Sequence, residues 1–285
     1  MSRFGNSFKQ YSFLRHRKVY LTIDKVFREL GIYYYLIGAS ARDVYLYKAG
    51  VEPKRLTGDV YFAIMIPDME KYSIVAATLE GNGFQKDPKI PHSFIFESCG
   101  TRIDVLPYGE VEKEGMINFK EGLTEMSVLG YKEVGIDPEL FEHELTEGLS
   151  IPVASLHGLV ILKLVAWHEN PAGRLKDLED VKILLYAAWE IYEGEIYQKN
   201  SPHLDVFDEK DFQIPIAAAR VMGRKMKPVL DQNEELKKLI TGLFDQEQQN
   251  DPGPLTRHRE MIGNQTVGEV KEIVNALRKG IDDYV

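Results

Sequence analysis

Two aspartates, Asp59 and Asp104, stand out because each interrupts an otherwise apolar run with strand-like alternation. Asp59 opens residues 59–66, and Asp104 lies within residues 102–106. Successive side chains of a strand point to opposite faces, so both acids are predicted to face away from the apolar core side. Two carboxylates on neighbouring strands suit Mg²⁺, which takes one or two such ligands together with waters and substrate phosphates. The alternative interpretation is a pair of solvated strand acids.

A glycine-serine turn precedes the first of these acids. Residues 33–37 form a short aromatic and aliphatic run, which Gly38, Ala39 and Ser40 interrupt. Glycine lets the backbone approach an anion closely, and the free N–H groups at a helix start can bind its charge. We therefore predict a phosphate-binding turn at Gly38 and Ser40, beside Asp59.

Lys163 is the only formally charged residue within residues 156–167, a stretch that otherwise predicts an apolar helix. A buried ammonium group needs a partner. Either Lys163 forms a structural ion pair with a nearby carboxylate, or it reaches a cleft as a point charge for phosphate. The next helix opens with Arg174 and Asp177, and two interpretations stay open there as well. These charges either belong to the same site or form a solvated helix end with i,i+3 pairs.

Other charged or polar patterns indicate less. Arg220, Arg224, Lys225 and Lys227 lie on one predicted helix, where we favour a solvated face over a surface that steers RNA. The seven histidines show no zinc-binding spacing, and the chain contains neither a phosphate loop ending in Gly-Lys-Ser nor a nucleophile elbow.

Length and composition indicate an ordinary globular chain. Its 285 residues predict about two domains. Hydrophobic residues at 44% and charged residues at 28% exclude a disordered or collagen-like protein. The formal net charge of −9 disfavours non-specific binding to long nucleic acid, although a local basic groove or a bound divalent metal could admit a phosphorylated substrate.

Cysteine content and hydropathy bear on the compartment. Cys99 is the only cysteine and cannot form an internal disulfide, which is typical of a reducing compartment. We find no targeting segment, and the most apolar stretch, residues 159–167, contains Lys163 and is too short to span a bilayer. We therefore expect a cytoplasmic protein without a membrane segment.

The elements that must position these residues divide the chain in two. Apolar periodicity predicts helices and alternating strands in the first half, and almost only helices from residue 156 onward. We predict an α/β domain with a small mixed sheet over residues 1–150, and a helical domain over residues 151–285. A nucleotide would lie in the cleft between them. The predicted strands are 33–37, 59–66, 93–98 and 102–106, and the clearest helices are 15–30, 68–80, 156–167, 214–229 and 233–243.

Four short motifs, taken in order, resemble the nucleotidyltransferase superfamily, specifically the minimal bacterial proteins grouped with AbiEii-type abortive-infection toxins. The glycine-serine turn at residues 38–40 matches that family's turn. Residues 55–62, Arg-Leu-Thr-Gly-Asp-Val-Tyr-Phe, resemble its Arg-x-Thr-x-Asp-hydrophobic-Asp-Phe segment, and residues 102–105 resemble its strand with the third catalytic acid. Lys163, followed by residues 174–180, resembles the lysine, arginine and Lys-Asp-x-x-Asp elements of the helical half.

This resemblance implies an activity and a set of site residues. The reaction would transfer a nucleoside monophosphate from a nucleoside triphosphate, with Mg²⁺ or Mn²⁺ bound by Asp59 and Asp104. The acceptor would be RNA, a protein or a small molecule, and a cognate antitoxin is an expected type of partner. By resemblance, Asp59, Asp104 and Lys163 are catalytic, and the nucleotide-binding residues are Gly38, Ser40, Arg55, Lys163, Arg174 and Asp177.

Tyr61 departs from the family pattern, which has a second acid two residues after Asp59. The pKa of a tyrosine is ordinarily near 10, so the phenol is neutral at pH 7 and is a poor ligand for Mg²⁺. Two readings follow. Either the chain is a nucleotidyltransferase that Tyr61 impairs, or it is a catalytically inactive module that binds a nucleotide or a partner.

Overall fold

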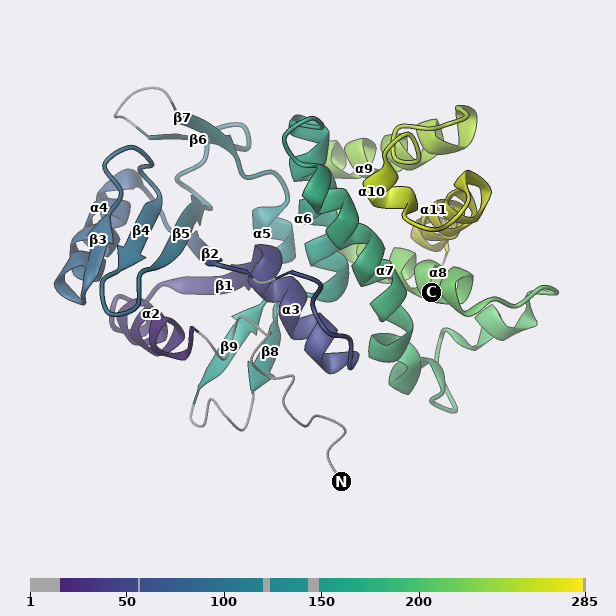
Figure 1. Ribbon diagram of the computed structural model, residues 1–285, viewed down its shortest axis with the longest axis horizontal. Coiled ribbons are helices and arrows are strands. Elements are labelled where there is room, and N and C mark those ends of the chain that lie inside the picture. The colour runs from purple at the N-terminus through teal and green to yellow at the C-terminus, as the bar shows by residue number, and fades with distance from the viewer. Residues whose placement is uncertain (1–15, 56, 120–123, 143–148, 284–285) are drawn as a thin grey trace. The chain divides into compact units, whose positions relative to one another are not determined.

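The computed structural model describes residues 16–55, 57–119, 124–142 and 149–283 (Figure 1). The chain divides into two compact units. The first comprises Met1–Tyr47 and Glu52–Ser155, and the second comprises Lys48–Val51 and Leu156–Val285. The predicted fold class is confirmed, because a mixed sheet with flanking helices is followed by a helical unit.

A seven-stranded sheet forms the centre of the first unit, in the order β3-β4-β5-β2-β1-β9-β8. β2 pairs in parallel with β5, β1 pairs in parallel with β9, and the other neighbours are antiparallel. The strands are β1 (Tyr33–Ile37), β2 (Asp59–Met65), β3 (Phe84–Lys86), β4 (Ser93–Phe96), β5 (Thr101–Tyr108), β8 (Glu139–Glu142) and β9 (Ser150–Val153).

One face of this sheet carries the apolar core that the alternation predicted. Phe62 on β2 is fully buried, and its ring lies 6.1 Å from Phe27 and 6.0 Å from Tyr34. Phe27 belongs to the helix α2 (Arg17–Glu29), which therefore covers this face. A second helix, α4 (Met69–Gly81), is capped by Asp68, whose side chain accepts from the backbone N–H of Lys71. The acids of β2 and β5 are left on the opposite face.

The region that the sequence determined least, residues 108–149, adds short elements. They are β6 (Met116–Phe119), β7 (Thr124–Ser127), α5 (Tyr131–Val134) and β8. β6 and β7 form a separate two-stranded sheet. Tyrosines of β1 bind the turns of this region, since the Tyr33 hydroxyl donates to the carbonyl of Gly135 at 2.6 Å and the Tyr35 hydroxyl donates to that of Tyr131 at 2.5 Å.

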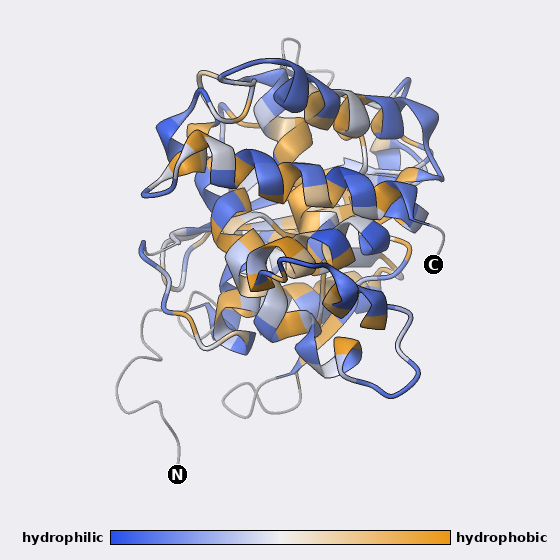
Figure 2. Cartoon of the chain, turned by 90° about the vertical axis from the view of Figure 1, so that its right-hand side faces the viewer, coloured by the Kyte–Doolittle hydropathy of each residue, from blue (hydrophilic) through white to orange (hydrophobic). Residues whose placement is uncertain are grey.

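The second unit consists of helices, along which hydrophilic and hydrophobic residues alternate (Figure 2). They are α6 (Leu156–Glu169), α7 (Leu175–Ile196), the 3-10 helix η3 (Leu204–Asp208), α8 (Ile214–Leu230), α9 (Glu234–Gln249), α10 (Arg259–Ile262) and α11 (Val267–Asp282). Thr266 and Glu269 form a capping box at the start of α11. Within the described ranges, no helix combines the length and the hydropathy needed to cross a membrane.

Two glycines let α8 and α11 cross at close range. A Cβ atom on Gly223 would run into the carbonyl oxygen of Leu277, and one on Gly280 would run into the carbonyl oxygen of Arg220. Both obstacles are helix backbone, which cannot rotate away as a side chain does. The crossing therefore requires glycine at both positions.

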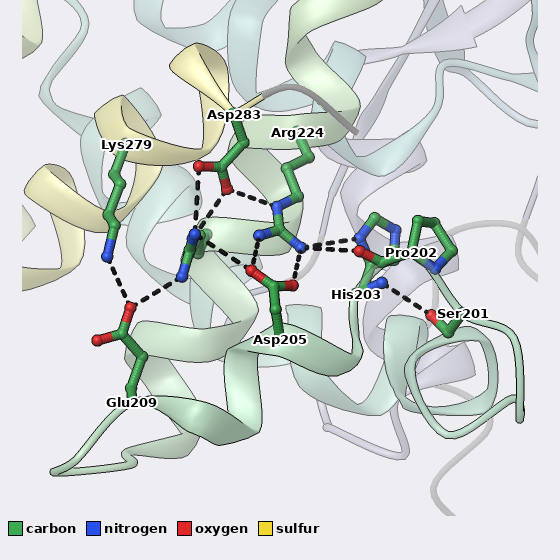
Figure 3. A network of polar contacts seen from close by, with 9 residues as sticks. Ser201, Pro202, His203, Asp205, Glu209, Arg224, Lys279 and Asp283 are labelled. Carbon is green, nitrogen blue, oxygen red and sulfur yellow. Dashed lines mark hydrogen bonds and ion pairs between the residues drawn. The ribbon is translucent and has the colours of Figure 1, made fainter.

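An ionic network corrects the prediction of a solvated basic face on α8 (Figure 3). The Arg224 side chain is only 4% exposed and donates to Asp205 of η3 and to Asp283 after α11. Arg220 donates to the same Asp283 at 2.8 Å. Glu209 accepts from Arg220 and from Lys279, which joins the two helices further. Arg220 and Arg224 thus pair with acids distant in the sequence, and Lys225 pairs with Glu195, whereas Lys227 pairs with Asp231 one helical turn away.

Candidate functional site

Asp59, Tyr61 and Asp104 share one face of the sheet. Asp59 and Tyr61 are two residues apart on β2, so their side chains point the same way. In the parallel pair β2 and β5, Tyr61 lies opposite Asp104, and Asp59 lies opposite Arg102. The register therefore places the two predicted acids on one surface, with Tyr61 beside Asp104.

Asp104 is buried, at 8% exposure, and its Oδ1 atom has no hydrogen-bond partner among the described residues. The pKa of Asp104 is raised because burial disfavours its charged form, and the nearby Asp59 carboxylate adds to the rise. A hydrogen bond from Ser93 and the charges of His92 and Arg102 oppose it. Asp104 thus presents an acceptor oxygen that the described protein groups leave unsatisfied.

This arrangement fits one divalent metal ion better than two. Mg²⁺ binds through one or two carboxylates and completes its shell with waters and phosphates, which Asp59 and the unsatisfied oxygen of Asp104 permit. Within the described ranges, no group of three or more His, Cys, Asp or Glu residues is placed to hold a metal. The phenol of Tyr61 supplies no third charge.

Gly38 begins the helix α3 (Gly38–Lys48) with a φ of 71°, a left-handed value that glycine adopts without strain. A Cβ atom at this position would lie 3.2 Å from Cδ2 of Tyr61. The ring of Tyr61 therefore lies directly against the turn. The backbone of Gly38 and the side chain of Tyr61 together form the surface next to the acids.

Ser40 connects the turn to β2. Its side chain is fully buried, and its hydroxyl donates to the backbone carbonyl of Asp59 at 3.3 Å. Ser40 thus fixes the start of α3 against the residue that carries the first acid. Arg55, predicted to bind nucleotide, is half-buried in the connection between α3 and β2.

Sequence reasoning missed a buried ion pair in the first turns of α3. Arg42 and Asp43 are 2% and 0% exposed, and the guanidinium Nη2 lies 2.6 Å from Oδ1 of Asp43. The same nitrogen donates to the hydroxyl of Thr57 at 3.2 Å. The pair supports the connection that leads into Asp59. Adjacent opposite charges in a short helix were the only available signal.

His92 is a second residue that the sequence did not single out. Its ring lies 5.6 Å from Phe119, and its Nδ1 is buried without a partner among the described residues. Burial lowers the pKa of His92, while the charge of Asp104 opposes that shift. His92 precedes Ser93, the register partner of Asp104 on β4. It therefore belongs to the surroundings of the second acid.

In the helical unit, Lys163 lies between two carboxylates of α7. Its Nζ is 2.9 Å from Oδ1 of Asp177 and 2.7 Å from Oδ2 of Asp180. The lysine side chain is 6% exposed and that of Asp180 is 2% exposed. Arg174, which is largely exposed, approaches Asp177 at 3.7 Å. Of the two readings of Lys163, this geometry shows the ion pair.

The structure therefore brings the predicted residues together in two groups. Gly38, Ser40, Asp59 and Asp104 gather within the first unit, and Lys163, Arg174 and Asp177 gather within the second.

Comparisons with known proteins yield two solved structures of interest. The chain is 14% identical to the antibiotic-resistance factor ANT(2'')-Ia, with a TM-score of 0.34, over 63% of this chain and 94% of that one. It is also 14% identical to an antigenic nucleotidyltransferase-like protein from Paracoccidioides brasiliensis, with a TM-score of 0.39, over 78% of this chain and 90% of that one. No protein-family model matches the chain, and no curated protein matches it. The assignment of an activity therefore depends on the site residues themselves.

Proposed function

We propose that this protein transfers a nucleoside monophosphate from a nucleoside triphosphate to an acceptor. The observation that carries the proposal is the shared surface of Asp59 and Asp104, with an unsatisfied oxygen on Asp104 and the Gly38 turn alongside. A buried carboxylate oxygen without a hydrogen-bond partner, such as Oδ1 of Asp104, costs stability. A bound cation at this place would offset that cost.

In this proposal, the residues of the first unit have different roles in binding the metal and the triphosphate. Asp59 and Asp104 would hold one Mg²⁺ or Mn²⁺, which when bound neutralises phosphate charge and orients the triphosphate. The missing Cβ atom of Gly38 leaves room for the Tyr61 ring, and the free N–H groups at the start of α3 would bind the charge of a phosphate. Ser40 keeps this turn in register with Asp59 through the carbonyl contact described above. The burial of Asp104 strengthens its attraction to a cation, since the local dielectric is low.

A second function, binding without turnover, is favoured by Tyr61. Its ring packs on the Gly38 turn at the position where the resembling family has an acid. With one metal rather than two, the attacking and leaving oxygens cannot both be neutralised by metals. In this form the protein would hold a nucleotide, or a partner, without catalysis.

Several finer points belong to the same proposal. The resemblance to AbiEii-type proteins implies an RNA or protein acceptor and a cognate antitoxin. It also assigns nucleotide contacts to Arg55, Lys163, Arg174 and Asp177. The ion pairs of Lys163 with Asp177 and Asp180 mean that any such contact by the lysine would compete with its carboxylate partners.

The direct test is incubation with each labelled nucleoside triphosphate, Mg²⁺ or Mn²⁺, and total RNA or a protein extract, with transfer of the α-phosphate label as the readout. An active enzyme labels an acceptor, and Asp59→Asn abolishes the labelling. If no label transfers but the triphosphate still raises the melting temperature in the presence of metal, the protein is a binding module. If neither occurs, both nucleotide functions, transfer and binding, are wrong.

A further inference from the structure

An aromatic cluster on the second unit is independent of the site above. The rings of Tyr197, Phe207 and Phe212 form a continuous stack, with centroid distances of 5.5 Å and 5.3 Å and interplanar angles of 27° and 29°. Trp189 of α7 lies edge-on to all three rings, at interplanar angles of 90°, 89° and 69°. The three rings therefore stand side by side on the indole.

The outer rings of this stack are open to solvent. Tyr197 is 63% exposed and Phe212 is 39% exposed, whereas Trp189 is only 7% exposed. Leu204 and Ile214, in the segments that carry Phe207 and Phe212, are exposed as well. Contiguous exposed apolar surface on a soluble protein typically marks an interaction site. The buried indole thus packs against all three rings while Tyr197 and Phe212 stay exposed.

The charges around the stack are mainly acidic. Glu193 lies one helical turn after Trp189 and one turn before Tyr197, so it shares their face of α7. Asp208 and Asp211 are exposed in the segment between Phe207 and Phe212.

Glu190 is also exposed, and two lysines, Lys199 and Lys210, offset part of the negative charge. Within the described residues, neither these four acids nor the two lysines form an ion pair.

We propose that this aromatic stack docks an arginine-bearing segment of a partner polypeptide. A guanidinium stacks on aromatic faces and also forms bidentate hydrogen bonds with carboxylates, so one side chain satisfies both features of the surface. A lysine ammonium matches the charge but lacks the planar fork. Single-stranded nucleic acid also stacks on aromatic rings, but it requires a basic groove for its phosphates, and among the charges here that form no ion pair with described residues, acids outnumber lysines.

The test uses the full-length protein and fluorescein-labelled decamers, read by fluorescence anisotropy. The probes are alternating Arg-Gly, Lys-Gly and Glu-Gly peptides and an oligouridine. The Arg-Gly peptide should bind saturably and more tightly than the Lys-Gly peptide, and the other two should not bind. Equal binding of the Arg-Gly and Lys-Gly peptides, tighter binding of oligouridine, or no saturable binding of the Arg-Gly peptide would overturn the proposal.

Two variants separate the rings from the acids. Y197S/F212S removes the outer rings and should weaken Arg-Gly binding by about tenfold, which lies between the cation–π contributions of exposed and of desolvated sites. D208N/D211N keeps the rings and should lower both the affinity and its dependence on salt. Tyr186→Ser, an exposed tyrosine of the same helix outside the stack, is the control and should leave binding unchanged. If the control weakens binding as much as Y197S/F212S does, the stack is not the docking site.

Discussion

Tyr61 occupies the position on β2 that faces Asp104 across the parallel strand pair, and its ring contacts the Gly38 turn. These two contacts place it where a third carboxylate would complete an acidic cluster. The electrostatic balance of the site therefore depends on this residue. With tyrosine, the surface holds two acids and a neutral phenol, and the space beside the glycine is filled by a ring.

Tyr61→Asp is expected to strengthen metal binding and to raise nucleotidyl transfer, because it adds a carboxylate beside Asp59 and Asp104. It should also lower the melting temperature in chelator, since three carboxylates repel one another, and Mg²⁺ should reverse that loss. Thermal melts with and without Mg²⁺ and the label-transfer assay measure both effects. Tyr61→Phe, which keeps the ring, is the control. A variant that binds no more metal than the parent would count against the impaired-enzyme reading.

Lys163→Met is expected to destabilise the fold by about 3 to 5 kcal/mol, because it removes the lysine from the buried carboxylate of Asp180 and from the partly buried carboxylate of Asp177. Urea unfolding measures this loss. Lys238→Met is the matched control, since its side chain is 74% exposed and pairs only with an exposed acid one turn away. A stable Lys163→Met protein that binds triphosphate less well would show that the lysine acts on the nucleotide instead.

At the scale of elements, the crossing of α8 and α11 depends on glycine. Gly223→Ala should destabilise the protein by about 1 to 3 kcal/mol, as overpacking does when the obstacle is rigid backbone. Gly242→Ala in α9 is the control, because a Cβ atom there meets no neighbour within 4 Å. Alanine stabilises a helix relative to glycine, so Gly242→Ala should raise the free energy of unfolding by about 0.5 to 1 kcal/mol. Equal effects of the two substitutions in urea unfolding would disprove the close crossing.

Strand β1 could be predicted from its continuous aromatic and aliphatic run, and β2, β4 and β5 from alternation; in β2 and β5 the acids fall on the face opposite the apolar residues. The short strand β3 and the register of β1 with β9 could not, since three residues carry too little pattern and non-local pairing leaves no local signal. The partners of Lys163 were predicted only as one of two alternatives. Choosing between them required the packing of α6 on α7.

At the scale of the whole molecule, acids and bases distant in sequence join the helices of the second unit. Arg224 reaches Asp205 and Asp283, which lie 19 and 59 residues away, so a local reading of α8 could only see an unpaired basic face. Acidic pairing also bears on the net charge of −9. Arg220 and Arg224 form ion pairs within the protein and therefore do not create a basic surface for nucleic acid.

This network predicts a stability that depends on pH. Hydrogen bonds from Arg224 lower the pKa of Asp205, and in Asp283 those from Arg220 and Arg224 outweigh the opposing effect of burial and lower its pKa too. A carboxyl whose pKa is lower in the folded state stabilises above its unfolded pKa, and this stabilisation is lost as the pH falls below about 4. In urea unfolding, the difference between the parent and Asp283→Asn should therefore shrink from pH 6 to pH 3. A difference that stays constant would contradict the network's role.

The central claim is that Asp59 and Asp104 together hold a divalent cation for a nucleoside triphosphate. Binding of Mn²⁺, followed by electron paramagnetic resonance in the presence of a non-hydrolysable triphosphate, tests it most directly. The structure predicts one site per chain, weakened by both Asp59→Asn and Asp104→Asn. Asp68→Asn serves as the control, because asparagine also caps a helix and α4 should be unaffected. Unchanged Mn²⁺ affinity in Asp104→Asn, with the fold intact, would contradict the claim.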